Sequence, residues 1–150
     1  MIGLSRKAGS ATAIALACLL SGHASASPDN RAIVRDFARL FYTQKNVERA
    51  FRAYVAPNYI QHNPGIADGR EAAVRALRPL FSPRSRQRFK IRHVLVDRDV
   101  AAIHVLAIDD RNGARTAVVD LYRLSKGHIV EHWDVLQPVP AHSKNAHPMF

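Results

Sequence analysis

The spacing of apolar residues changes once along this chain, and that change limits the fold more than any other feature. Before Pro83, apolar residues recur three to four positions apart, which is the period of an amphipathic helix. After Pro83, apolar and polar residues alternate, as in a strand with one buried face. Three helices are therefore expected, beginning near Ser27, Asn46 and Asp68. Four strands are expected to follow, over Arg88–Val96, Val100–Ile108, Arg115–Leu124 and His128–Gln137.

Helices that precede an antiparallel run of strands are typical of the α+β fold class. Pro57 is expected to end the second helix, and Tyr59–Gly65 to form a short extended piece before the third. Asn112-Gly113 is a strong signal for a hairpin between two of the strands. A strongly curved sheet wrapped over the helices would form a cone with one open mouth, a natural place for a small-molecule pocket.

The first 26 residues have the pattern of a secretory signal peptide. Arg6 and Lys7 form a basic start, Ala11–Leu20 is an apolar stretch, and Ala24-Ser25-Ala26 is a cleavage site of the A-x-A type. The stretch is shorter than the roughly 18 residues that span a bilayer, so cleavage and a periplasmic or secreted product without stable membrane insertion are expected. A membrane anchor, or a lipoprotein acylated at Cys18, is the alternative.

The rest of the chain fits one domain of ordinary size. Of the 150 residues, 27–140 carry the predicted elements, and 141–150 form a polar tail that is expected to be flexible. Cys18 is the single cysteine, which excludes an intrachain disulfide framework and a zinc site built on cysteines. Neither an H-E-x-x-H motif nor a glycine-rich phosphate loop occurs, so no metal and no cofactor are expected.

The formal net charge of +10 favours anionic partners or anionic surfaces. Basic side chains concentrate between Arg84 and Arg92, but this run lacks the series of aromatic residues on which nucleic-acid bases stack. We therefore expect a solvated basic face and no nucleic-acid partner. Association with an anionic envelope surface through this face is a weaker alternative.

Asp120 is an unexpected residue in the predicted sheet, because it interrupts an otherwise apolar strand between Val119 and Leu121. A carboxyl group that is removed from water favours its protonated form, which allows it to act as a general acid or base near neutral pH. The structural alternative is an ion pair between Asp120 and an arginine such as Arg123 at the face of the sheet.

Two motifs make the chain similar to the SnoaL-like branch of the NTF2-like superfamily. The first is Tyr59–Gly65 (YIQHNPG), and the second is Val119–Leu124 (VDLYRL) together with Gly127–Asp134 (GHIVEHWD). The resemblance covers about Asp29 to Pro138. It implies an α+β cone, in which three N-terminal helices pack in a strongly curved, mostly antiparallel sheet around a deep pocket. It also implies a homodimer formed through the sheet, and members of this family include polyketide cyclases that catalyse an aldol condensation.

The resemblance implies roles for single residues. Asp120 stands where SnoaL-like cyclases keep their acid–base aspartate, and the spacing of His104 before it resembles the histidine–aspartate pairing of those enzymes. His62 and Asn63 lie in a segment that the family places at the pocket wall, where an imidazole can shuttle a proton and an amide can bind an enolate oxygen. The plainer alternatives are that His104 is a satisfied core histidine and that His62 and Asn63 fix a turn.

Tyr122, Trp133 and Asp134 complete the residues expected to contact a substrate. Alternation places His132 and Asp134 on one face of the last strand and Trp133 on the other, without showing which face is the pocket. For Asp134, a salt bridge at the end of the strand is the alternative.

The residues and the resemblance together predict cofactor-free acid–base chemistry, of the aldol (cyclase) or isomerase type, on a small hydrophobic carbonyl compound. Asp120 would be the acid or base, His104 and His62 would assist proton transfer, and Asn63 would hold the enolate oxygen. The alternative is a non-catalytic module that uses the same fold to bind a small ligand or to dimerise.

Overall fold

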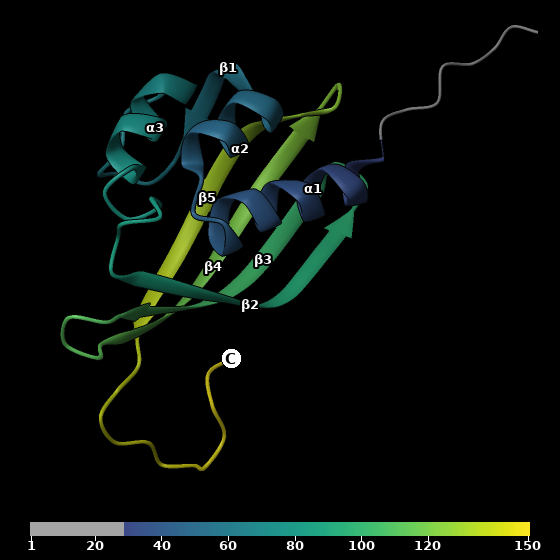
Figure 1. Cartoon of the computed structure of the whole chain (residues 1–150). Coiled ribbons are helices and arrows are strands. Elements are labelled where there is room, and N and C mark those ends of the chain that lie inside the picture. Colours follow the sequence, from purple (N-terminus) through teal and green to yellow (C-terminus); the bar gives the residue numbers. More distant parts are fainter. Residues whose placement is uncertain (1–28) are drawn as a thin grey trace, which may run out of the picture.

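The structure is a computed structural model that describes residues 29–150, and it has the expected α+β architecture (Figure 1). Its helical segments are α1 Asn30–Ala38, the π-helical turn η1 Arg39–Thr43, α2 Val47–Tyr54 and α3 Arg70–Leu77. Its strands are β1 Val55–Gln61, β2 Gln87–Asp97, β3 Val100–Asp109, β4 Arg115–Ser125 and β5 His128–Pro138. The predicted signal peptide lies outside the described residues. Within them, no helix combines the length and apolar character that crossing a membrane requires.

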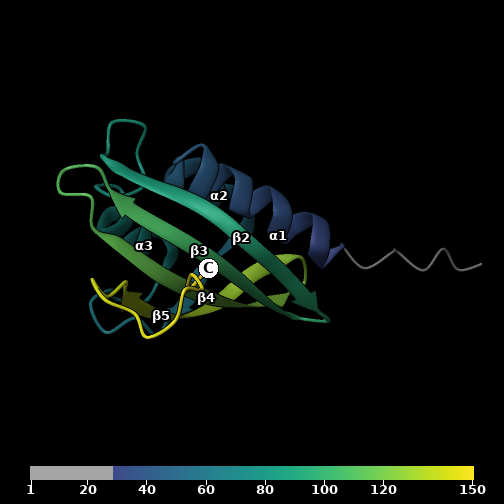
Figure 2. The same ribbon diagram turned by 90° about the horizontal axis from the view of Figure 1, so that it is seen from below.

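The five strands form one mixed sheet in the order β1-β5-β4-β3-β2. The four long strands pair antiparallel, and β1 adds a parallel pair with β5 at one edge. In Figure 1 the helices lie on one face of the sheet, and Figure 2 shows β2 and β3 bending along their length. The curved sheet and the helices make the predicted cone, so that the sheet has an inner face toward the helices and an outer face away from them.

The edge strand β1 replaces the short extended piece that the sequence analysis placed at Tyr59–Gly65. The second helix ends already at Tyr54, and Pro57 lies inside β1 rather than at the end of the helix. Proline fits there because an edge strand can spare one backbone N–H. The turn that follows is held by the Asp68 carboxylate, which accepts the backbone N–H of Gln61 at 2.8 Å.

The first helix begins with a side-chain cap and ends in an irregular turn. Asp29 provides the cap by accepting a backbone N–H of the first turn at 2.9 Å, whereas Ser27, near which this helix was predicted to begin, lies outside the described residues. In η1 the Gln44 N–H donates to the carbonyl of Arg39, five residues earlier, at 2.9 Å. One additional residue is thereby fitted into the turn, and Tyr42 lies in the interior with 2% of its surface exposed.

Strand β2 contains a bulge that reverses its predicted alternation. The pairing with β3 shifts in register between Ile91 and His93. Phe89 and Ile91 pack against the core, but beyond the bulge Val94 does so and Leu95 is 66% exposed. Uninterrupted alternation over the predicted strand Arg88–Val96 would place His93 and Leu95 on the same face as Phe89. That part of the prediction is wrong, because one inserted residue exchanges the two faces of a strand.

Aromatic side chains fill the space between the helices and the sheet. Phe37 and Phe51 are 0% and 1% exposed, and the centroids of their rings are 5.8 Å apart. On the sheet side, Ile103 and Ile129 are fully buried. This core fixes the helices against the inner face and sets the walls of the cavity beside it.

The tail predicted at residues 141–150 contains neither helix nor strand. The ring of its last residue, Phe150, lies 5.5 Å from the guanidinium carbon of Arg92 and 6.0 Å from that of Arg115. These separations are typical of cation–π contacts. Part of the basic surface that was expected to be solvated thus contacts the end of the chain.

Candidate active site

A cavity of about 300 Å³ lies between the helices and the inner face of the sheet. A volume of this size holds a small organic molecule. One wall is a column of phenylalanine rings, in which the centroids of Phe41 and Phe81 are 3.9 Å apart and those of Phe81 and Phe89 are 4.2 Å apart. Leu80 and Leu136, which are 43% and 54% exposed, mark the side of the cavity that faces solvent. Most of the wall is apolar, so the few polar groups stand out.

The polar groups at the inner end come from two neighbouring strands. Asp120 and Tyr122 line the cavity from β4, and His132 and Asp134 line it from β5. The antiparallel register places Asp120 directly opposite Asp134 and Tyr122 directly opposite His132. Two ionised carboxylates at directly opposite positions of two paired strands repel each other. This pair of aspartates therefore requires a nearby proton or positive charge, and His132 is placed to supply it.

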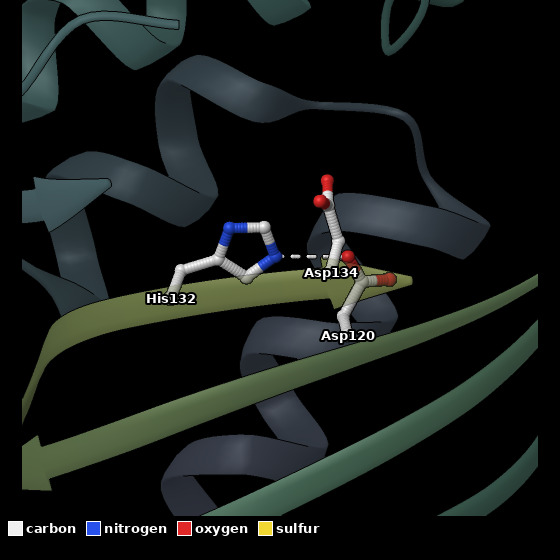
Figure 3. A group of neighbouring side chains, drawn as sticks. All are labelled: Asp120, His132 and Asp134. Atoms are coloured by element: carbon white, nitrogen blue, oxygen red, sulfur yellow. Dashed lines mark hydrogen bonds and ion pairs between the residues drawn. The ribbon is translucent and has the colours of Figure 1, made fainter. Parts of the chain in front are cut away.

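Asp120 is 8% exposed, and both of its carboxylate oxygens are hydrogen-bonded. Nε2 of His132 lies 2.9 Å from Oδ1 (Figure 3), and the hydroxyl of Tyr42 donates to Oδ2 at 2.7 Å. Burial, and then the charge of Asp120, raises the pKa of Tyr42 well above its ordinary value, so this hydroxyl stays a donor. The hydroxyl of Tyr122 lies 2.9 Å from that of Tyr42 and donates to it.

His132 is held through its second ring nitrogen as well. Nδ1 lies 2.8 Å from Oε1 of Gln61, and the same oxygen accepts the backbone N–H of Asn63 at 2.9 Å. Gln61 and His132 are 9% and 7% exposed. The ring is therefore fixed between a carboxylate and an amide and cannot rotate without losing both hydrogen bonds.

Asp134 is half-buried, and its Oδ2 accepts a hydrogen bond from the side-chain amide of Asn63 at 2.6 Å. A nitrogen of His132 and an oxygen each of Asp120 and Asp134 lie within 4.8 Å of one another (Figure 3). One imidazole and two carboxylates are a donor set that a divalent metal ion accepts. In this structure the imidazole and one carboxylate are already partners of each other. The expectation that no metal is bound stays a prediction.

Four residues that the sequence analysis assigned to the site line this cavity. They are Asp120, the expected acid or base, and Tyr122, Asn63 and Asp134, the expected substrate contacts. Arg123, the alternative partner for Asp120, instead donates to a glutamate on the outer face at 2.6 Å. The structure thus brings Asp120 into a cavity rather than into a surface ion pair.

His62 and Trp133 lie on the outer face, which corrects their predicted place in the pocket. The two rings stack with their centroids 4.6 Å apart, and Nε2 of His62 lies 2.8 Å from a carboxylate oxygen of Glu131. This hydrogen bond lowers the pKa of Glu131. The cause is the alternation along β5: because His132 points inward, the residues on either side of it point outward, and His62 packs against them.

His104 also lies outside the cavity, so its predicted pairing with Asp120 is wrong. Its Nδ1 is 3.2 Å from Nδ1 of His93, and the two rings stack with their centroids 5.5 Å apart. Ile103 and Val105 are fully buried, and Ile103 is the register partner of Asp120 in β3. The alternation predicted for β3 is correct, but both of its faces carry apolar residues, so the pattern alone does not show which face is inside.

Three side chains of the site were missed by the sequence analysis. His132 shares a face with Asp134 by alternation, and that pairing was the available signal. Gln61 shares a face with the buried Tyr59, so it can be found once Tyr59 is taken as part of the core. Tyr42 reaches the site only because of the π-helical turn, which no local pattern in the sequence indicates.

Comparison with known proteins points to one family and one fold. The SnoaL-like domain family matches residues 34–132. No curated protein matches the sequence significantly. Among solved structures, an NTF2-like protein of unknown function from Mesorhizobium loti has 23% sequence identity and a TM-score of 0.61, over 73% of this chain and 96% of that protein.

Two further solved structures are similar to the chain. TsrD from Streptomyces laurentii has 20% identity and a TM-score of 0.57, over 71% of this chain and 90% of TsrD. A candidate SnoaL-like polyketide cyclase from Jannaschia sp. CCS1 has 16% identity and a TM-score of 0.57, over 70% of this chain and 85% of that protein. At these identities the likeness shows the NTF2-like fold, and the reaction has to be argued from the site.

Proposed function

This chain belongs to the SnoaL-like domain family, and we propose that it is an enzyme that transfers protons on a small, mostly apolar carbonyl compound. One observation above all supports the proposal. A buried acid–base pair, Asp120 with His132, lies beside a second carboxylate, Asp134, at the polar end of an otherwise apolar cavity. These side chains suffice for proton transfer, so a reaction of the aldol (cyclase) or isomerase type can proceed here without a cofactor.

Asp134 is the base in this proposal. Its hydrogen bond from Asn63 engages Oδ2, which leaves Oδ1 to approach a C–H group next to the carbonyl. The C–H bond breaks, its proton passes to Asp134, and its electron pair forms a C=C bond while negative charge moves to the carbonyl oxygen. The Asp120–His132 pair gives its proton to that oxygen. In an isomerisation Asp134 returns its proton to another carbon of the enol system, and in an aldol reaction the enol carbon attacks a second carbonyl, whose oxygen takes that proton. In both cases the C=O bond forms again and the O–H proton returns to the Asp120–His132 pair.

Asn63 gains a second role in this proposal, beside the one predicted for it. One N–H of its side-chain amide donates to Asp134 at 2.6 Å and orients the base, so the main donor to the enolate oxygen is assigned to another group. The negative charge that develops on the carbonyl oxygen of the substrate is instead stabilised by the Asp120–His132 pair. The low polarity of the surroundings strengthens this interaction. The column of Phe41, Phe81 and Phe89 offers a flat apolar wall. A ketone or enone that carries a ring is therefore the substrate class that fits best.

The charges of the cavity predict which ligands it accepts. Among the described residues that line it are two aspartates and one histidine but neither lysine nor arginine, although the chain as a whole carries +10. A ligand carboxylate about 4 Å from Asp134 would meet a repulsion of about 4 kcal/mol at an effective dielectric constant of about 20. We expect a neutral aryl ketone to bind at least about tenfold more tightly than the matched ketone with a carboxylate.

The experiment that tests the proposed function uses three aryl ketones with one skeleton and a neutral, ammonium or carboxylate substituent. Nuclear magnetic resonance in deuterated water measures exchange of the hydrogens next to the carbonyl. The protein should accelerate exchange in the neutral ketone, and Asp134→Asn should abolish the acceleration. Asp97→Asn is the matched control, because the side chain of Asp97 is 83% exposed. Exchange no faster than in buffer would reject the enzyme, and tight binding without exchange would favour a non-catalytic ligand-binding module.

We also propose that two copies of the chain associate through the outer face of the sheet, as the family resemblance implies. Leu95, Val119 and Val135 are 66%, 36% and 66% exposed on that face. Clustered aliphatic side chains at a surface favour contact with a second apolar surface. Sedimentation velocity should show a dimer that Val135→Glu converts to a monomer of unchanged secondary structure. A wild-type protein that is monomeric at every concentration would contradict this.

A further inference from the structure

A continuous series of hydrogen bonds determines which ring nitrogen of His132 carries a hydrogen atom. The series starts at the backbone N–H of Asn63, which can only donate and which lies 2.9 Å from Oε1 of Gln61. The end of the Gln61 amide that faces this N–H must therefore be its oxygen. The opposite end, Nε2, points to the hydroxyl oxygen of Tyr59 at 3.5 Å, which can accept. The orientation of the Gln61 amide is thus fixed by the backbone.

The oxygen of Gln61 in turn fixes the imidazole. It lies 2.8 Å from Nδ1 of His132 in addition to its contact with Asn63. An amide oxygen has two lone pairs and no hydrogen, so it accepts both bonds and donates neither. Nδ1 of His132 must therefore carry a hydrogen atom, whether the ring as a whole is neutral or charged.

The other side of the ring then has one proton to share with Asp120. Nε2 of His132 and Oδ1 of Asp120 are 2.9 Å apart, so a hydrogen lies between them. Either an imidazolium faces a carboxylate, or a neutral imidazole faces a carboxylic acid. Both arrangements hold the same number of protons and have no net charge. The hydroxyl of Tyr42 donates to Oδ2 and so does not take the place of this proton.

We propose that Gln61 is a positioning residue that keeps one transferable proton between His132 and Asp120. The competing state has one proton fewer: a neutral ring with its hydrogen on Nε2, donating to an ionised Asp120. In that state the bare Nδ1 would face the lone pairs of the Gln61 oxygen in a buried site, which is costly. Gln61 therefore excludes the state in which the pair has already lost its proton.

This inference deepens the proposed function, and only its consequence for catalysis rests on that function. It makes the Asp120–His132 pair an acid in the resting protein and leaves Asp134 as the base. The two roles are then divided before a substrate binds. The hydrogen on Nδ1 itself follows from the hydrogen bonds alone, so it can be tested without any substrate.

The test is nitrogen-15 magnetic resonance of the histidine rings in the full chain, treated with a chelator, at mildly alkaline pH. The His132 signals are identified by their absence from His132→Asn. In the wild type, Nδ1 should show the chemical shift and the one-bond coupling of a protonated nitrogen. Gln61→Met has a similar volume and only a weak acceptor, so Nδ1 should lose its hydrogen and the ring should keep one hydrogen, on Nε2. Gln61→Glu retains an oxygen acceptor and should keep the hydrogen on Nδ1.

An unprotonated Nδ1 in the wild type would overturn the proposal, and that result does not depend on the folding of a variant. So would Gln61→Met with a wild-type circular dichroism spectrum and a hydrogen still on Nδ1 of His132. Loss of ketone exchange in Gln61→Met and its recovery in Gln61→Glu would support the role in catalysis. A protonated Nδ1 in a protein that exchanges no ketone would support the assignment of the ring while rejecting the proposed function.

Discussion

Asp120→Asn is expected to lower the rate of ketone exchange by about 10²- to 10⁴-fold, the contribution of one well-placed acid–base group. Asparagine has nearly the shape of aspartate. Its oxygen can accept from Tyr42 and its amino group can donate to Nε2 of His132, so both hydrogen bonds of the native carboxylate are replaced. What is lost is the proton that the native pair can transfer. The effect should therefore fall on kcat, with ligand affinity nearly unchanged.

The controls for Asp120→Asn separate chemistry from folding. The free energy of unfolding should stay within about 1 kcal/mol of the wild type, because no buried group loses its partner. Asp97→Asn makes the same chemical change at a side chain that is 83% exposed, and its exchange rate should equal that of the wild type. If Asp120→Asn catalyses hydrogen exchange in the ketone at the wild-type rate, Asp120 has no acid–base role. The assignment of Asp120 to the acid and Asp134 to the base would then be wrong.

The long strands were predictable because apolar and polar residues have to alternate along a half-buried strand. The strand expected at Arg115–Leu124 is found at Arg115–Ser125, and the one expected at His128–Gln137 is found at His128–Pro138. The parallel edge strand was not predictable in the same way. Its pairing joins β1 to a strand about 70 residues later in the sequence, as in the pair of Gln61 with His132, and no local pattern carries that information.

Two single-residue irregularities could not be predicted from the spacing of apolar residues along the sequence. The bulge near Ile91 and the π-helical turn at Arg39–Thr43 each insert one residue, and each changes which side chains face inward. Such insertions depend on the packing of the whole domain and have no fixed residue signature. They explain why Leu95 is exposed and why Tyr42 is buried beside Asp120.

The site was only partly predictable, for a related reason. Asp120 was identified because a carboxylate in an apolar strand needs an explanation. Its partner was not identified, since His62, His104 and His132 are equivalent as sequence letters and differ only in the face on which each one lies. The structure selects His132, at 2.9 Å from Asp120, and places the other two on the outer face.

Phe37→Ala is expected to lower the free energy of unfolding by about 3–5 kcal/mol, the usual cost of removing a buried phenylalanine ring. Phe37 is 0% exposed, and its ring centroid lies 5.3 Å from that of Phe41 and 5.8 Å from that of Phe51. It also meets the ring of Tyr122 on the sheet, edge to face, at 5.3 Å. Removing the ring opens a void between α1 and the strands, which are held in register and cannot close it.

Urea unfolding, followed by circular dichroism, measures the effect of Phe37→Ala as a lower midpoint at an unchanged slope. Phe150→Ala is the matched control, because its ring lies near the guanidinium groups of Arg92 and Arg115 and not in the core, so its loss should cost no more than about 1 kcal/mol. A loss of about 3–5 kcal/mol is a large share of the roughly 5–15 kcal/mol that stabilises a domain. A change below about 1 kcal/mol would contradict the packing of α1 against Tyr122, and with it the support for the hydroxyl that donates to Tyr42 beside Asp120.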